Sequence, residues 1–255
     1  MNGAKNTIPV GISNRHIHLA PNDVEILFGL GAQLTHHRTI SQTGQFAAKE
    51  TLDVAGPKGK ISGVRVVGPN RPRTQLEIAP SDARVLGVSP PVRYSGDLDG
   101  STGVKLVGPK GELQIREGVI VPQRHIHMNP DDAQKFGVHD RARVIVAPAS
   151  RPDHNPQNES RHVVFDNVLI RVDPGFVLDF HIDVDEANAA GLKNDDHVKI
   201  IGFSDSNVPA PHSGLITEND VRKAILRKTK IRLSAQARLT PAALDLGKEF
   251  SVFEN

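Results

Sequence analysis

The chain of 255 residues contains no cysteine and no tryptophan, and it has a single tyrosine and two methionines. Without cysteine the protein can form neither a disulfide framework nor a cysteine-ligated zinc site. A cysteine thiolate, the commonest covalent acyl carrier, is excluded as well, although a serine nucleophile stays open. Any zinc site must therefore use ligands other than cysteine.

A large charge of either sign is also absent. The 31 lysine and arginine residues nearly balance the 29 aspartate and glutamate residues, which gives a formal net charge of +2. No global field therefore favours nucleic acid or a membrane as a partner. No apolar run reaches the length of a signal peptide or a membrane span, so the sequence predicts a soluble cytoplasmic protein.

The motif Arg-His-Ile-His occurs twice, at residues 15–18 and, 109 residues later, at residues 124–127. Residues i and i+2 of a strand point to the same face, so each motif places two imidazoles side by side. A single pair on an apolar strand can be purely structural, but packing does not require two imidazoles on one face, and the duplication favours metal binding. Zinc takes three protein ligands in catalytic sites and four in structural sites, so each pair needs a further ligand.

A common pattern follows His18, Glu77, His127 and His181. An acidic residue lies five residues after each, and a glycine lies ten or eleven residues after each; in three of the four cases a proline lies three residues on. Proline, an early acid and a final glycine bracket a short helix. Glu77 and His181 thus end strands equivalent to the histidine strands, and we expect them to complete two triads: His16, His18 and Glu77, and His125, His127 and His181.

Many short strands, tight turns and short helices predict a mainly β fold with two related small β-barrels from an internal duplication, plus a C-terminal helical tail. The length suffices for two domains of about 100 residues and an appendage. Residues 8–19 are expected to form one strand. The predicted division is a disordered lead at 1–8, a first barrel repeat at 9–95, a second barrel repeat at 96–202, and a linker with a helical tail at 203–255.

Several motifs together resemble the phosphate propanoyltransferases, a family of phosphotransacylases. They are Gly11-Ile-Ser-Asn-Arg-His-Ile-His, Gly44-Gln-Phe-Ala-Ala, Gly68-Pro-x-Arg71-x-x-Thr-Gln-x-Glu77, Gly96-Asp-Leu, Arg124-His-Ile-His-Met and His181-Ile-Asp-x-Asp-Glu-Ala-Asn188. The resemblance runs from about residue 8 to residue 202. It implies a two-domain β-barrel enzyme with two zinc ions per chain that exchanges an acyl group between coenzyme A and phosphate, often inside a bacterial microcompartment.

The resemblance also implies roles for individual residues. One zinc ion is expected on His16, His18 and Glu77, and the other on His125, His127 and His181, which agrees with the triads above. Phosphate is expected to contact the side chain of Arg71 and the backbone of Ser95. The implied contacts of coenzyme A are Ser13, Arg65, Val67, Asn188 and Arg38, the last at a position where the resembled enzymes usually have lysine.

The chemistry requires cations that hold both substrates while negative charge develops on the acyl oxygen, and zinc is a suitable Lewis acid. We expect direct attack of phosphate, held by Arg71, on the thioester of propanoyl- or acetyl-coenzyme A, followed by departure of the thiolate. Arg71 could instead be a surface residue. Two other classes stay open: a zinc-dependent hydrolase of an ester or phosphate, and a non-catalytic zinc-braced scaffold. The acyl chain, the direction, the metal and the oligomeric state, including a homodimer, stay open too.

The segment 203–255 lies outside the resemblance. Residues 209–214 read as a linker, and Thr217 with Asp220 forms a capping box that starts a helix. A second short helix is expected after Thr240, and residues 222–238 contain seven basic residues and no acidic one. A linker followed by short, partly apolar helices is typical of a docking tail. Because the resembled enzymes often lie inside a microcompartment, we expect residues 209–255 to dock to its shell or core proteins, with packing of the tail on its own barrels as the alternative.

Overall fold

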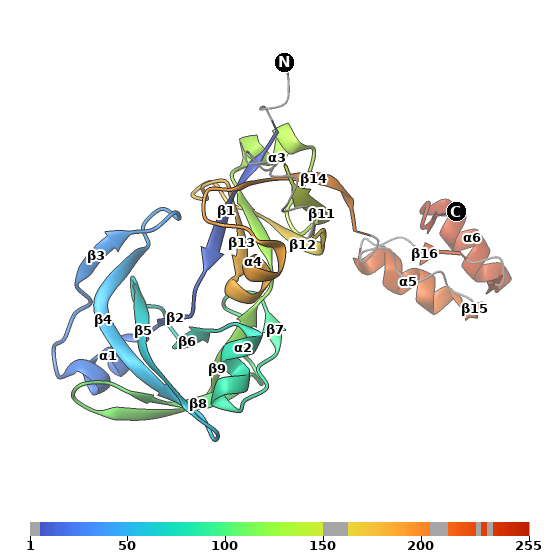
Figure 1. The fold of residues 1–255 in the computed structure, drawn as a ribbon. Coiled ribbons are helices and arrows are strands. Elements are labelled where there is room, and N and C mark those ends of the chain that lie inside the picture. Colours follow the sequence, from blue (N-terminus) through green and yellow to red (C-terminus); the bar gives the residue numbers. More distant parts are fainter. Residues whose placement is uncertain (1–5, 150–162, 205–213, 228–230, 234–236, 255) are drawn as a thin grey trace, which may run out of the picture. The chain divides into compact units, whose positions relative to one another are not determined.

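The computed structural model describes residues 6–149, 163–204, 214–227, 231–233 and 237–254. The chain divides into two compact units, Met1–Phe203 and Ser204–Asn255. In the part of the chain that the structure describes, no helix has both the length and the apolar character needed to cross a membrane. Figure 1 shows the strands and helices of both units, which are described separately here.

The first unit contains a closed ring of six strands in which each strand pairs with the next and the last pairs with the first. In ring order the strands are β4 (Phe46–Ala55), β5 (Lys60–Gly68), β2 (His16–His18), β6 (Gln75–Glu77), β9 (Glu112–Pro122) and β8 (Thr102–Val107). Two short strands, β3 (His36–Thr39) and β7 (Val92–Arg93), pair with β4 and β9. Buried aliphatic side chains such as Ile17, Val66 and Leu76 fill this barrel.

A second closed barrel of six strands lies in the same unit. In ring order its strands are β1 (Ile8–Ser13), β13 (Asp179–Asp183), β10 (His125–Met128), β12 (Phe165–Val172), β11 (Arg143–Pro148) and β14 (His197–Phe203). Its core contains Val10, Ile126 and the edge-to-face pair Phe165 and Phe180. The prediction of two small barrels is confirmed.

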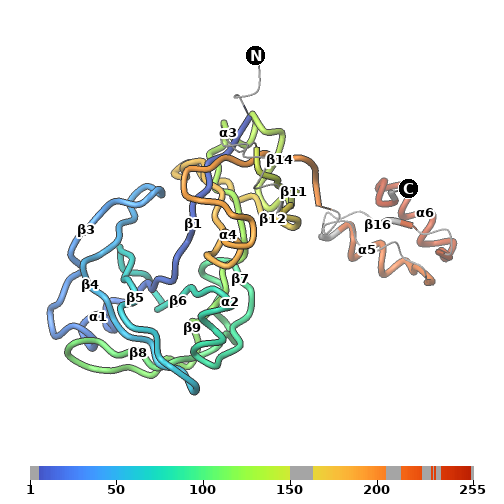
Figure 2. Tube along the Cα trace, viewed as in Figure 1, coloured from blue at the N-terminus to red at the C-terminus, as the bar shows by residue number. Residues whose placement is uncertain are grey.

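The barrels are not contiguous in the sequence, which corrects the predicted division into 9–95 and 96–202. Strand β1 belongs to the second barrel, whereas β8 and β9 belong to the first. The expected single strand at 8–19 is therefore two strands, which Figure 1 labels β1 and β2, and Figure 2 shows the blue tube running onward from β1. The break lies at Asn14, whose side-chain oxygen accepts a hydrogen bond from the Arg15 amide at 2.8 Å. Val10 is buried in the core of the second barrel and Ile17 in the core of the first. The segment from β1 to β2 therefore connects the two cores.

A short helix follows each strand that ends in a candidate ligand, as the repeat pattern predicts. The four helices are α1 (Pro21–Phe28), α2 (Pro80–Leu86), α3 (Pro130–Phe136) and α4 (Val184–Ala190). Three of them begin with proline, and a glycine follows each helix. Gly87, Gly137 and Gly191 have left-handed backbone angles with φ of 75°, 66° and 60°, a conformation that glycine adopts without steric cost.

The second unit has its own small apolar core, which includes Ile216, Val221, Ala243 and Val252. Its helices α5 (Glu218–Arg227) and α6 (Pro241–Glu249) start directly after Thr217 and Thr240. Strands β15 (Leu215–Ile216) and β17 (Arg238–Leu239) pair in parallel, as do β16 (Ile231–Arg232) and β18 (Phe253–Glu254). The predicted linker at 209–214 lies outside the described residues except for Gly214.

Candidate active site

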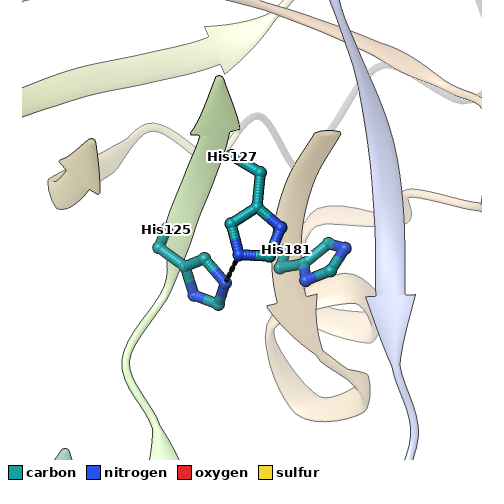
Figure 3. A group of neighbouring side chains, drawn as sticks. All are labelled: His125, His127 and His181. Atoms are coloured by element: carbon teal, nitrogen blue, oxygen red, sulfur yellow. Dashed lines mark hydrogen bonds between the residues drawn. The ribbon is translucent and has the colours of Figure 1, made fainter. Parts of the chain in front are cut away.

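The two predicted triads form at equivalent places in the two barrels. His16 pairs directly with Glu77 across β2 and β6, and His125 pairs with His181 across β10 and β13. Within each triad the candidate ligand atoms lie within 4.8 Å of one another. Figure 3 shows the three rings of His125, His127 and His181, which come from two strands and gather around a common space. The duplicated motif therefore produces two duplicated clusters.

Backbone carbonyls orient the histidine rings. In three of the rings Nδ1 lies at hydrogen-bond distance from a backbone carbonyl oxygen. The distance is 2.9 Å from His16 Nδ1 to the Asn14 oxygen, 3.0 Å from His18 Nδ1 to the Val67 oxygen, and 2.8 Å from His125 Nδ1 to the Gln123 oxygen. Since a carbonyl only accepts, Nδ1 carries the proton and Nε2 presents a lone pair. Such hydrogen bonds fix the tautomer and the orientation of metal-binding histidines.

The second triad fits a divalent metal ion of the zinc type. His125 Nε2 lies 3.1 Å from His127 Nε2, and two nitrogens in a tetrahedral zinc site lie about 3.3 Å apart. His127 Nδ1 is buried and has no hydrogen-bond partner among the described residues. His181 Nε2 lies 2.9 Å from Asp179 Oδ2, a carboxylate contact typical of metal-binding histidines.

The first triad is mixed, with two imidazoles and one carboxylate. His16 Nε2 lies 3.6 Å from Glu77 Oε2, and both Glu77 and His18 are buried. Each triad supplies three candidate ligands from the described residues, the number found in zinc sites that keep one position for water or substrate.

Burial and neighbouring charges set the protonation states of four of the candidate ligands. Burial, with the nearby His16 and Arg71, lowers the pKa of His18 to about 3. Burial also lowers the pKa of His125 and of His127 well below the usual value. For Glu77, burial acts to raise the pKa, but the neighbouring imidazoles and the Arg71 guanidinium outweigh it and lower the pKa. At neutral pH these histidines are neutral and the glutamate is ionised, as metal ligands must be.

Both triads line one cavity of about 1090 Å³. Most of the residues predicted to contact substrates also line it: Ser13, Arg38, Arg65, Val67, Arg71 and Ser95. Arg38 is exposed on β3, and Arg65 donates to the carbonyls of Ala48 and Lys49 at 3.0 and 2.9 Å. Asn188 is exposed on α4 and is not among the residues that line the cavity.

Arg71 is held inside the cavity and is not a surface residue. Its Nη1 donates to Ser95 Oγ at 2.8 Å, and the amide of Gln75 donates to the same oxygen at 2.8 Å. Burial lowers the pKa of Arg71, while the charge of Glu77 raises it. Arg73, two residues on, instead pairs with Asp99 at 2.7 Å and with Glu117, where its side chain is 46% exposed. The structure thus distinguishes Arg71, which lines the cavity, from the exposed Arg73, a distinction that residue spacing alone does not make.

Four further residues of the cavity were not predicted from the sequence, and they are Gln42, Arg171, Phe176 and Val177. Arg171 of β12 pairs in register with His127, and its guanidinium lies 5.3 Å from the ring centroid of Phe176. The amide of Gln42 donates to the Val177 carbonyl at 3.1 Å and accepts from the Val177 amide at 3.3 Å. The strand alternation that identified the histidines could have identified Arg171, but nothing local predicts the contact of Gln42 with a loop 135 residues away.

Comparison with known proteins gives a consistent result. A family model described as phosphate propanoyltransferase matches residues 9–193, a range that contains both triads. The chain is 50% identical over 198 residues to a phosphate propanoyltransferase of Thermotoga maritima. The aligned part covers 77% of this chain and 90% of that relative. For that of Rhodobacter capsulatus the identity is 47% over 195 residues, 76% of this chain and 86% of the relative. For that of Salmonella typhimurium it is 46% over 187 residues, 73% of this chain and 85% of the relative.

Proposed function

Because the chain belongs to the phosphate propanoyltransferase family, we propose that the cavity lined by both triads is where an acyl group moves between coenzyme A and phosphate. The observation that carries this proposal is the convergence of six candidate metal ligands and the partly buried Arg71 on one cavity. Enzyme sites combine a concave pocket with titratable groups whose pKa values are shifted, and both features occur here.

His16, His18 and Glu77 would hold one zinc ion, and His125, His127 and His181 would hold a second. When bound, zinc supplies Lewis-acid polarisation and stabilises a thiolate near neutral pH. The donor set of imidazole and carboxylate, with no cysteine in the chain, suits zinc and also related divalent metals. Three protein ligands per ion favour a catalytic site over the closed, four-ligand site of a zinc-braced scaffold.

The remaining groups position the substrates. The planar guanidinium of Arg71, fixed by Ser95, can donate to two oxygens of phosphate at once and direct a third toward the acyl carbon. An oxygen–carbon bond forms, the carbon–sulfur bond breaks, and the electron pair leaves with the coenzyme A thiolate. No cysteine is available for an acyl-enzyme, so direct transfer is the simplest route.

Coenzyme A is proposed to enter along the part of the cavity that carries Ser13, Arg38, Arg65 and Val67, with Asn188 as an outer contact. A cavity of about 1090 Å³ can accept a ligand of this size. Propanoyl-coenzyme A is the proposed substrate, and acetyl-coenzyme A is a shorter alternative.

The test is release of free thiol from propanoyl-coenzyme A with and without phosphate, with acyl phosphate trapped by hydroxylamine. The proposal expects release that depends on phosphate and yields one acyl hydroxamate per thiol. Thiol release that is equally fast without phosphate would instead identify a hydrolase.

We also propose that the C-terminal unit directs the enzyme to the shell or core of a bacterial microcompartment. Its support is a separate apolar core and a basic run at residues 222–238, which could serve docking without contributing to catalysis. Deletion of residues 209–255 should leave metal content and turnover intact and release the enzyme from the compartment. An unfolded or inactive truncated protein would favour a structural role for this unit.

A further inference from the structure

Arg171 is a further guanidinium of the cavity, and it comes from the barrel opposite to that of Arg71. In the parallel pairing of β10 with β12, Leu169 lies opposite His125 and Arg171 lies opposite His127. Arg171 also lines the cavity. His16 pairs with Arg65 in the same parallel arrangement, so Arg171 occupies the place that Val67 has in the first barrel. The duplication therefore puts an apolar residue at this place in one barrel and a cation in the other.

The side chain of Arg171 is pre-positioned by an aromatic ring. Its guanidinium lies 5.3 Å from the Phe176 centroid, and Phe176 stacks on His127 with centroids 4.3 Å apart. Arginine stacks well on aromatic faces and keeps its donors free at the edges of the fork. Among the described residues, no hydrogen bond or ion pair occupies these donors. A partly buried guanidinium with free donors is suited to an anionic ligand.

The two guanidiniums are close enough to repel each other. The pKa of Arg71 is lowered by burial and also by the positive charge of Arg171, with Glu77 acting in the opposite direction. Burial likewise lowers the pKa of Arg171, while the charge of Glu77 acts to raise it. Arg171 therefore lines the same cavity as both triads, where it pairs in register with His127 and feels the charge of Glu77. An anion bound there would relieve the repulsion.

We propose that Arg171 binds the phosphate substrate together with Arg71, so that the phosphate is held between guanidiniums from the two barrels. This inference rests on the proposed function. Phosphate has four oxygens, so two guanidiniums can each engage it while one oxygen stays free to attack the acyl carbon. Arg71 is fixed by Ser95 and Arg171 by Phe176, so both donors are oriented before phosphate arrives.

The test compares Arg171→Gln and Arg171→Lys with Arg116→Gln, an exposed arginine of β9 that does not line the cavity. The dissociation constant for inorganic phosphate is measured by calorimetry on metal-loaded protein without coenzyme A, and KM is measured for each substrate. Metal content and circular dichroism must match the unsubstituted protein. Arg171→Gln should raise the phosphate dissociation constant and KM by about tenfold or more, because a charged hydrogen bond is lost.

Arg171→Lys should show a smaller rise, and KM for propanoyl-coenzyme A should change by less than about twofold in both variants. An unchanged dissociation constant for phosphate in Arg171→Gln would overturn the inference. A rise confined to KM for propanoyl-coenzyme A would assign Arg171 to the coenzyme, and a fall in kcat alone would assign it to the acyl oxygen; either result overturns the inference. Direct phosphate binding is measured without turnover, so it judges Arg171 even if the unsubstituted protein fails the thiol-release test.

Discussion

Arg15 Nη2 lies 2.8 Å from Asp82 Oδ1, and the duplicated residue Arg124 makes an equivalent 2.8 Å contact with Glu186. Each arginine immediately precedes the first histidine of a triad, and each acid lies five residues after the third member of the same triad. Both ion pairs therefore connect the histidine strand to the helix that follows the strand of the third ligand. This arrangement holds the ligand strands in register.

Replacement of Arg15 by methionine should destabilise the protein by about 1–3 kcal/mol, because it leaves the carboxylate of Asp82, which is 5% exposed, without its charged partner. The matched control is Lys60→Met, which breaks an ion pair with side chains 57% and 30% exposed and should cost much less, because solvent screens an exposed pair. Urea unfolding of the metal-free proteins measures both values. Equal costs for the two variants would show that the Arg15 pair has no special role.

Arg71→Lys keeps the positive charge but loses the planar fork that engages two phosphate oxygens, so KM for phosphate should rise by about tenfold. KM for propanoyl-coenzyme A should change much less. Arg73→Lys is the control, since Arg73 pairs with Asp99 and Glu117 outside the cavity, and it should leave both constants near their original values. Equal rises in both constants for Arg71→Lys would indicate a general packing role.

The stability of the metal-free protein should fall as the pH falls from 7 to 5.5. Burial, with His16 and Arg71, lowers the pKa of His18 from 6.5 to about 3, so the native state binds fewer protons than the unfolded chain in this range. The contribution of His18 is therefore present above pH 6.5 and is lost as the pH falls toward 3. His18 alone should account for about 1 kcal/mol of the loss between pH 7 and 5.5.

Urea unfolding at the two pH values checks this prediction. His18→Gln should reduce the loss of stability by that amount. The same pH dependence in His18→Gln as in the unsubstituted protein would contradict the assigned pKa shift.

The duplicated features could be predicted from sequence because each depends on local spacing. Alternation in a strand places His16 beside His18, and proline, acid and glycine bracket each short helix, so both triads follow from pattern alone. The exchange of strands between barrels could not be predicted in this way. Parallel pairing of β1 with β13 joins residues about 170 apart in the chain, and no local signal selects that partner.

The contacts across the cavity were unpredictable for the same reason. Gln42 and Val177 meet through loops, where neither alternation nor helical periodicity restricts the partner. The aromatic support of Arg171 similarly depends on Phe176, which lies in the turn between β12 and β13. Arg71 and Arg73 are two residues apart and chemically identical, and only the fold places Arg71 in the cavity.

The account depends most on the claim that two triads act together at one site, and zinc analysis of two variants tests it directly. The unsubstituted protein should bind about two equivalents of zinc, and His16→Ala and His125→Ala should each bind about one. Phosphate-dependent thiol release should be lost in both variants, because each triad lines the same cavity. If either purified variant kept two tightly bound metal ions and normal turnover, the ligand assignment and the shared site would both be wrong.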